Sequence, residues 1–149
     1  MATETERKFL VKGEFIHESV KSISIIQRYL SVDPQKTIRI RITDDTGFIT
    51  IKSPRSGGML SRSEWEFEIP VADATELMEI CLPGMVSKTR YIVPAGKHKI
   101  EVDVFHDKNE GLIIAEIELA AEDEPFERPD WLGEEVTGDP RYYSSMLIK

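Results

Sequence analysis

The first stretch of the sequence that could do chemistry is Glu4-Thr5-Glu6-Arg7-Lys8. Alternate residues of a β-strand point to the same side, so Glu4, Glu6 and Lys8 would share one face. Neighbouring carboxylates on one face repel each other, and this face therefore needs a ligand that offsets their charge. Carboxylate oxygens are the donors that hard divalent metal ions prefer, whereas an amine suits an anion such as phosphate.

The same alternation of charged and apolar residues recurs in six further stretches, and the signs of the charges segregate by stretch. The predicted ionic face carries six bases, namely Lys8, Arg39, Arg41, Lys52, Lys88 and Arg90. It also carries nine acids, namely Glu4, Glu6, Glu64, Glu66, Glu68, Glu101, Asp103, Glu116 and Glu118. An ordinary amphipathic sheet with its charges in solvent is the simplest alternative. The polar positions of these stretches are nearly all charged side chains, and each stretch carries mainly one sign of charge. Both features favour an enclosed face instead.

Such a face is too highly charged to be buried without a ligand. Arginine and lysine donors pair with phosphate oxygens, and carboxylates bind hard divalent cations. A face that needs both kinds of partner is suited to a complex of a metal ion with a polyphosphate.

The elements that position these charges are mostly strands. Alternation and turn signals predict eight of them, at residues 3–12, 25–32, 36–44, 47–53, 62–70, 87–94, 97–106 and 111–120. Helices are expected at residues 71–82, at residues 15–22 and after Asp139-Pro140. Eight strands joined by tight turns favour a meander, and eight is also a number at which a sheet can close into a small barrel.

Length and composition set the remaining bounds. At 149 residues the chain is expected to form one domain, residues 1–149. The net charge of −8 argues against general nucleic-acid binding. No apolar run is long enough for a transmembrane helix, and the N-terminus lacks the pattern of a signal peptide. Cys81 is the single cysteine, so it cannot form a disulfide within the chain. These features predict a soluble cytoplasmic protein without membrane partners.

The order of the charged motifs resembles that of the triphosphate tunnel metalloenzymes, also called the CYTH superfamily. The motifs that carry the resemblance are Glu4-x-Glu6-x-Lys8, Gln27-Arg28-Tyr29-Leu30, Arg39-Ile40-Arg41, Lys52, Arg62 with Glu64 and Glu66, Lys88-Thr89-Arg90-Tyr91, Glu101-Val102-Asp103, Glu116-Ile117-Glu118 and the tail from Glu135 to Tyr143. One departure is Arg28, where many relatives have glycine. An inward Arg28 would add a base to the tunnel, and an outward one would be harmless.

The resemblance implies a mainly β fold with a few helices, in which a closed eight-stranded antiparallel barrel forms a tunnel and a C-terminal helix lies near one mouth. It implies one or two Mg²⁺ or Mn²⁺ ions held by Glu4, Glu6, Glu116 and Glu118. Phosphate would be bound by Lys8, Arg39, Arg41, Lys52, Lys88 and Arg90. The catalytic candidates are Lys8, Glu64, Glu66 and Asp103. Either a second metal ion or one of these three carboxylates would activate the attacking water, and which carboxylate does so stays open.

The function expected from the resemblance is metal-dependent hydrolysis of the terminal phosphoryl group of a linear triphosphate. Chain length and the short acidic tail are most similar to those of the stand-alone bacterial tripolyphosphatases. A class IV adenylyl cyclase and a thiamine or nucleoside triphosphatase are alternatives within the family. A module that binds polyphosphate or a nucleotide without cleaving it is a further alternative, and a homodimer stays open.

Overall fold

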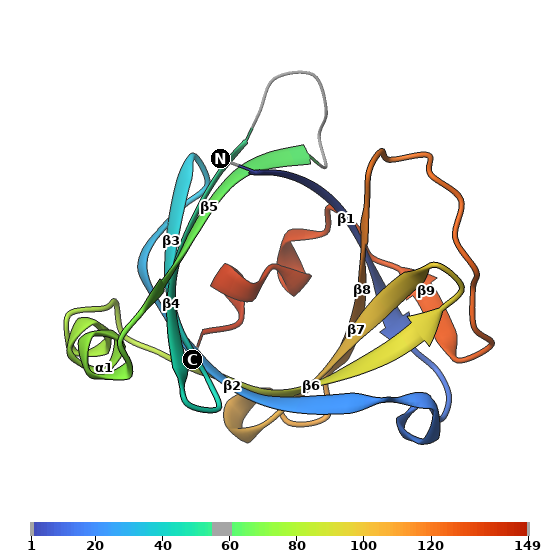
Figure 1. The fold of residues 1–149 in the computed structure, drawn as a ribbon, viewed down its shortest axis with the longest axis horizontal. Coiled ribbons are helices and arrows are strands. Elements are labelled where there is room, and N and C mark those ends of the chain that lie inside the picture. Colours follow the sequence, from blue (N-terminus) through green and yellow to red (C-terminus); the bar gives the residue numbers. More distant parts are fainter. Residues whose placement is uncertain (1, 55–60, 149) are drawn as a thin grey trace.

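The computed structural model describes residues 2–54 and 61–148, without the side chains of residues 2–4 and 61. Within these ranges it contains nine antiparallel strands and one α-helix, arranged around a central space (Figure 1). The strands are β1 (Ala2–Val11), β2 (Lys21–Asp33), β3 (Lys36–Thr43), β4 (Thr46–Pro54), β5 (Ser61–Ile69), β6 (Val86–Ala95), β7 (His98–Phe105), β8 (Ile113–Leu119) and β9 (Leu132–Glu135).

The strands pair in the order β5-β4-β3-β2-β6-β7-β8-β1-β9, and β1 also pairs with β5. Through this additional pairing, the pairings of β1 to β8 run in a cycle, which Figure 1 shows as a ring of strands. The register places Glu6 directly opposite Glu118 and Lys8 directly opposite Glu116 across β1 and β8. Side chains directly opposite on one face are close neighbours, so the register brings charged groups of distant sequence position together.

All eight predicted strands are present, with ends that differ from the prediction by up to four residues. The ninth strand, β9, pairs with β1 at Val11 and Phe9. Its sequence, Leu-Gly-Glu-Glu, is too short and too poor in apolar residues to show an alternation. The strand exists because the edge of β1 offers it backbone partners.

The predicted helix at residues 71–82 is the shorter helix α1 (Val71–Glu79), which packs against β3 and β4. Gly47 of β4 makes this approach close: a Cβ atom at position 47 would lie 2.8 Å from the Cβ of Ala74. Arg28 points outward beneath the end of α1, because its Nε donates to the carbonyl of Gly84 and its Nη2 to that of Leu82. The departure at Arg28 therefore adds no base to the inside of the ring.

The prediction of a C-terminal helix is wrong. Two separate 3₁₀ turns, Pro140–Tyr142 and Ser144–Met146, take its place. The cap expected at Asp139 does form, since its carboxylate accepts a hydrogen bond from the amide of Arg141. Tyr143, however, adopts an extended backbone between the turns, which ends helical hydrogen bonding after one turn. The expected helix at residues 15–22 is likewise only a 3₁₀ turn, Ile16–Glu18.

The larger apolar core lies outside the ring of strands. Phe9 of β1 packs edge-on against Phe126, and Phe15 packs against Tyr91 and Trp131, so the chain between β8 and β9 covers the outer faces of several strands. A second buried cluster consists of Val86, Phe105, Ile114 and Leu147. Val86, Phe105 and Ile114 have the parity of the charged inner face, so this cluster fixes Leu147 of the C-terminal segment inside the ring (Figure 1).

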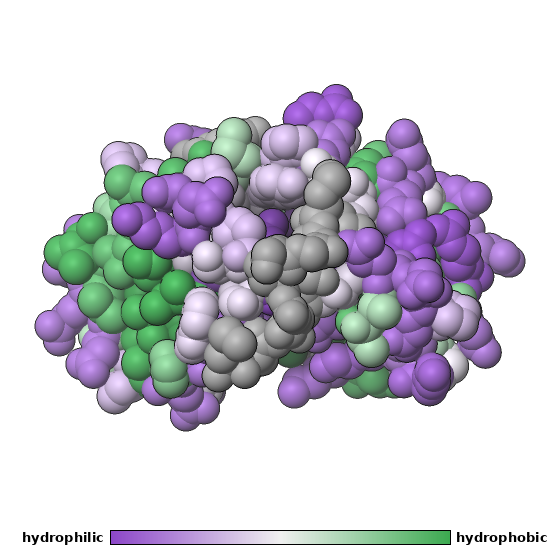
Figure 2. All heavy atoms as spheres, turned by 90° about the horizontal axis from the view of Figure 1, so that it is seen from above, coloured by the Kyte–Doolittle hydropathy of each residue, from purple (hydrophilic) through white to green (hydrophobic). Residues whose placement is uncertain are grey.

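The outer face is incompletely covered near α1. The side chain of Phe67, on the outer face of β5, is 58% exposed. Apolar side chains gather at the end of the molecule that carries α1 (Figure 2). Within the described residues, no helix has the length and apolarity that a membrane crossing requires.

Candidate active site

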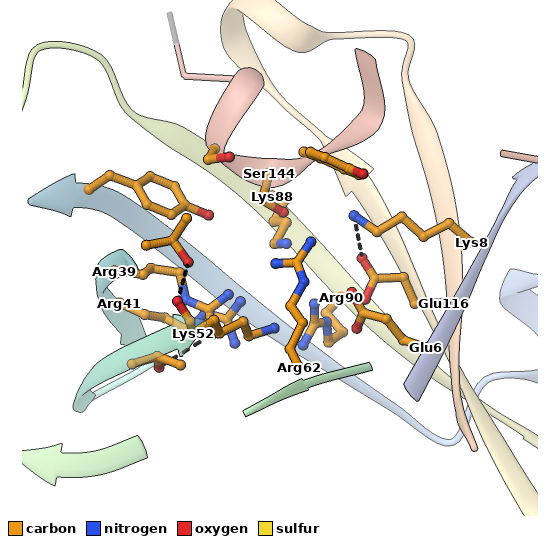
Figure 3. Close-up of a pocket in the computed structure, with 15 residues that line it drawn as sticks. Glu6, Lys8, Arg39, Arg41, Lys52, Arg62, Lys88, Arg90, Glu116 and Ser144 are labelled. Carbon is orange, nitrogen blue, oxygen red and sulfur yellow. Dashed lines mark hydrogen bonds and ion pairs between the residues drawn. The ribbon is translucent and has the colours of Figure 1, made fainter. Parts of the chain in front are cut away.

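The inner side chains of the ring line two adjoining cavities. The first, here called the basic cavity, is lined by Glu6, Lys8, Tyr29, Thr37, Arg39, Arg41, Thr50, Lys52, Arg62, Lys88, Arg90, Glu116, Tyr143, Ser144 and Ser145 (Figure 3). This lining includes seven basic side chains against two acidic ones. The C-terminal segment supplies Tyr143, Ser144 and Ser145, so its turns close one side of this cavity.

The second cavity, here called the acidic cavity, is lined by Glu6, Arg39, Arg41, Lys52, Glu64, Glu66, Arg90, Glu101, Glu116 and Glu118. Its lining includes six acidic side chains and four basic ones. Six residues line both cavities, which makes them parts of one continuous space. The site therefore has a polarity, from a basic end under the C-terminal turns to an acidic end away from them.

The predicted site residues divide into three groups by position. Eleven line one or both cavities: Glu6, Lys8, Arg39, Arg41, Lys52, Glu64, Glu66, Lys88, Arg90, Glu116 and Glu118. Asp103 is 2% exposed and lies behind the lining. The side chain of Glu4 is outside the described residues, and its backbone pairs with that of Arg62.

Asp103 is bound by two cations of the neighbouring strand. Its Oδ2 lies 2.7 Å from the Nζ of Lys88, and its Oδ1 accepts a 2.8 Å hydrogen bond from the Nε of Arg90. A second donor of Arg90, Nη2, donates to Oδ2 at 2.9 Å, so the arginine binds both carboxylate oxygens of Asp103. A fork of this kind fixes the orientation of the guanidinium.

Burial would raise the pKa of Asp103, but the charges and hydrogen bonds of Lys88 and Arg90 outweigh it and hold this pKa well below its usual range. Burial lowers the pKa of Lys88 to about 7, against the opposing attraction of Asp103. For Arg90, burial is outweighed by its acidic neighbours, which raise the pKa. Arg90 therefore stays charged at every relevant pH, whereas the pKa of Lys88 lies close to neutral pH.

Arg41 is held by a neutral partner. Its Nε and Nη2 both donate to the Oε1 of Gln27, at 3.1 and 2.9 Å, and Gln27 is fully buried. Burial, followed by repulsion from Arg39 and Arg90, lowers the pKa of Arg41 to about 9. The guanidinium is thus still a cation at neutral pH, and an amide positions it without neutralising its charge.

Arg39 belongs to a network with Thr50 and Glu66. The Thr50 hydroxyl donates to Oε2 of Glu66 at 2.9 Å, and the Nη2 of Arg39 lies 3.3 Å from that hydroxyl and 3.8 Å from Glu66. The Nε of Arg39 is buried and has no hydrogen-bond partner among the described residues. A buried donor without a partner is energetically costly, so an acceptor placed in the cavity would stabilise the folded protein.

Lys8 joins the charged face to the C-terminal segment. Its Nζ lies 3.6 Å from Oε1 of Glu116, donates to the carbonyl oxygen of Tyr142 at 3.2 Å and faces the ring of Tyr143 at 5.6 Å. Lys52, on the other side of the space, lies 3.9 Å from Glu64. Both cations therefore lie near a carboxylate and line the basic cavity.

The carboxylates offer a donor set that fits a divalent cation. Glu6 and Glu118 are direct cross-strand neighbours, and Glu116 is flanked by Lys8 on β1 and Glu101 on β7. Like charges directly opposite each other destabilise a sheet, and a bound cation would relieve this. In the described part of the chain no three such groups already converge, and the side chain of Glu4 lies outside that part.

Several lining residues were not among the predicted site residues. Arg62 and Glu101 have the parity of the charged face, which was the available signal. Thr50 of the lining and Gln27, which binds Arg41 without lining either cavity, are neutral, and nothing in a charge pattern distinguishes them from ordinary strand residues. Tyr143 reaches the cavity from the far end of the chain, and a contact of that kind has no local sequence signal.

Among protein-family models, the one described as the CYTH domain matches residues 2–143 of this chain. The chain belongs to the CYTH domain family.

This CYTH domain is similar along its length to characterised relatives. An inorganic triphosphatase of Acetivibrio thermocellus is 43% identical over 150 residues, which cover 100% of this chain and 95% of the relative. An inorganic triphosphatase of Nitrosomonas europaea is 37% identical over 151 residues, covering 97% and 96%. The crystal structure of an inorganic triphosphatase superposes with a TM-score of 0.69 at 33% identity, covering 97% of each chain. Triphosphatases of this family generally depend on a divalent metal ion.

Proposed function

We propose that this CYTH domain protein is an inorganic triphosphatase, which hydrolyses the terminal phosphoryl group of a linear triphosphate such as inorganic tripolyphosphate. The observation that carries the proposal is the basic cavity, where seven cationic side chains from several strands surround one space that adjoins a carboxylate-rich cavity. Bases in such number suit a polyanion, and the adjoining carboxylates suit its metal ion. Two relatives of full-length similarity are inorganic triphosphatases.

The architecture that we propose for catalysis is a closed eight-stranded tunnel. The pairing of β1 with β5 supports it, because β5 stands at one end of the strand order and this pairing joins it to β1, the last of the eight strands β1 to β8 in that order. A closed ring has no free edge on these strands and holds its inner side chains in fixed positions. Fixed donors stabilise developing charge without having to reorganise during the reaction.

The phosphate chain would be bound by Lys8, Arg39, Arg41, Lys52, Lys88 and Arg90. The unpartnered Nε of Arg39 supports this assignment, since a phosphate oxygen would supply the missing acceptor. Arg41 and Arg90 are held by Gln27 and Asp103 through paired hydrogen bonds, so each guanidinium has a fixed orientation and its remaining N–H donors are preorganised for phosphate. Lys8 would offset negative charge on the phosphoryl group as it is transferred.

Glu4, Glu6, Glu116 and Glu118 would hold one or two Mg²⁺ or Mn²⁺ ions. Oxygen donors are the ligands that these ions prefer, and the facing pair Glu6 and Glu118 supplies two of them. A divalent ion on the phosphates supplies charge neutralisation and polarisation of the phosphorus–oxygen bonds. The carboxylates also keep the acidic end of the space unattractive to a polyanion without its metal.

Activation of the attacking water is assigned to Glu64 or Glu66, which line the acidic cavity. Asp103, the third carboxylate considered from the sequence, has both oxygens engaged by Lys88 and Arg90. A carboxylate with a strongly depressed pKa is a weak base, so we assign Asp103 a positioning role.

The test is a panel of tripolyphosphate, pyrophosphate, ATP and thiamine triphosphate, assayed with Mg²⁺ or Mn²⁺ for phosphate and cyclic nucleotide together. The proposal expects phosphate release from tripolyphosphate with the highest kcat/KM and no cyclic product. Tight binding of tripolyphosphate without phosphate release, under either metal, would instead identify a binding module.

A further inference from the structure

A short polar residue stands between a base and an acid on one wall of the ring. Arg39 of β3 lies directly opposite Thr50 of β4, and Thr50 lies directly opposite Glu66 of β5. Thr50 is buried, and it lines the basic cavity. Strands two apart in a sheet are about 10 Å from each other, a gap that the long side chains of Arg39 and Glu66 can bridge above the threonine.

The hydroxyl of Thr50 bonds to both of these neighbours. It donates to Oε2 of Glu66 at 2.9 Å and accepts from Nη2 of Arg39 at 3.3 Å. Nη2 of Arg39 and Oε2 of Glu66 are themselves 3.8 Å apart, which is longer than a hydrogen bond. The threonine hydroxyl therefore replaces a direct hydrogen bond between the guanidinium and the carboxylate.

The next inner arginine of β3 is also separated from the acids of β5. Figure 3 shows Arg39 and Arg41 on the same wall of the cavity. Arg41 donates twice to the Gln27 amide, and Phe48 of β4 lies between Arg41 and Glu68 of β5 in the cross-strand row. Both arginines thus donate hydrogen bonds to neutral groups, which orient them without neutralising their charge.

We propose that Thr50 is a positioning residue of the phosphate site, whose hydroxyl keeps Arg39 from closing onto Glu66. Without the hydroxyl, the guanidinium would form a direct pair with the carboxylate, and this pair would compete with phosphate for the same donors. With the hydroxyl in place, the buried Nε of Arg39, which has no hydrogen-bond partner among the described residues, stays available to a phosphate oxygen. This inference rests on the proposed function and adds a residue that acts through Arg39 rather than on the substrate.

The first test is T50V, which keeps the shape of the side chain and removes the hydroxyl. Calorimetric titration of tripolyphosphate in EDTA measures binding without metal and without turnover. T50V should raise Kd about 5-fold, because the direct pair must open before phosphate binds, and the exposure of Glu66 (43%) screens that pair and limits its strength. T50S keeps the hydroxyl and should bind as tightly as the wild type.

The decisive measurement is a second substitution at Glu66. E66Q keeps the shape but cannot form the ion pair, so it should restore most of the affinity that T50V loses. Removing an acid also favours a polyanion in the wild type, and the gain from E66Q should therefore be about 5-fold larger in the T50V background. The matched control is E68Q, which removes the same charge from the same strand beside Phe48 and should give equal gains in both backgrounds.

Three results would overturn the positioning role while the triphosphatase function stands: wild-type affinity in T50V, equal gains from E66Q in both backgrounds, or a T50S that binds as weakly as T50V. Circular dichroism and urea denaturation establish that each variant is folded before binding is compared. T50A also lacks the hydroxyl and takes the place of T50V if the valine does not fit. A wild type that neither binds nor cleaves tripolyphosphate would refute the proposed function instead.

Discussion

The ammonium group of Lys88 and the carboxylate of Asp103 lie 2.7 Å apart, with side chains that are 1% and 2% exposed. Arg90 binds the same carboxylate through two donors. The pair is thus a buried ionic centre directly behind the basic cavity. Lys88 and Arg90 both line the basic cavity, and these two buried cations depend on the single carboxylate of Asp103 for their stability.

Asp103→Asn should destabilise the protein strongly. It leaves Lys88 and Arg90 buried without their counter-ion, and breaking a buried pair by removing one partner costs about 3–5 kcal/mol. Urea denaturation followed by circular dichroism measures the change in free energy of unfolding. The matched control is Asp139→Asn, because its partner Arg141 is 77% exposed and the pair is worth little. Equal stability of D103N and D139N would contradict the prediction.

Tripolyphosphate binding near pH 8 should be accompanied by proton uptake at Lys88. With its pKa lowered to about 7, the side chain is mostly neutral at pH 8 in the free protein. A polyanion in the cavity favours the charged form and raises the pKa, so the lysine gains a proton on binding. Calorimetry in EDTA, in two buffers of different ionisation enthalpy, counts the protons. The wild type should take up more protons than K88Q, and equal uptake by the two would disprove the assignment.

Arg41→Lys should lower kcat for tripolyphosphate by about 10-fold or more, because removing one well-placed donor at a site of developing charge typically costs a few kcal/mol. Gln27 holds the guanidinium through two of its nitrogens, and a lysine cannot reproduce that fork. Steady-state kinetics at saturating Mg²⁺ separate the alternatives: a rise in KM alone would mean that Arg41 acts equally on ground and transition states. Arg28→Lys on the outer face controls for the exchange itself.

Glu6→Gln should abolish most activity while the fold survives. The change removes one anionic oxygen of the facing pair Glu6 and Glu118 with little change in shape, so the affinity for the metal should fall. Activity titrated with Mg²⁺ should then require far higher concentrations, and Glu79→Gln on α1 should behave as the wild type. Undiminished turnover of the wild type in EDTA would refute the metal-dependent mechanism.

Much of the site could be predicted from alternation alone. Because the side-chain period of a strand is two, Arg39 and Arg41 had to lie on the same face of their strand. The same rule covers Glu64 and Glu66, and the order of these motifs along the chain carried the family resemblance. Which face was inside did not follow from alternation, since an amphipathic sheet satisfies it either way.

The C-terminal segment shows where local signals failed. Asp139 and Pro140 are a sound helix start, and the cap does form. After this cap the chain forms two separate 3₁₀ turns instead of one helix. Leu147, which follows the second turn, is buried against Val86, Phe105 and Ile114. Packing inside the ring outweighed the preference of a short helix, which is weak in isolation.

The sequence by itself determined which side chains of each strand share a face, because strand alternation is a local property of the backbone. Only the tertiary structure decided how those charges are partnered. Asp103 is held between Lys88 and Arg90 because antiparallel pairing puts β7 beside β6, and Arg28 faces outward onto the end of α1. Tyr143 meets Arg62 across the cavity because the fold returns the end of the chain to its interior. Such contacts depend on distances between residues remote in sequence, which no local pattern encodes.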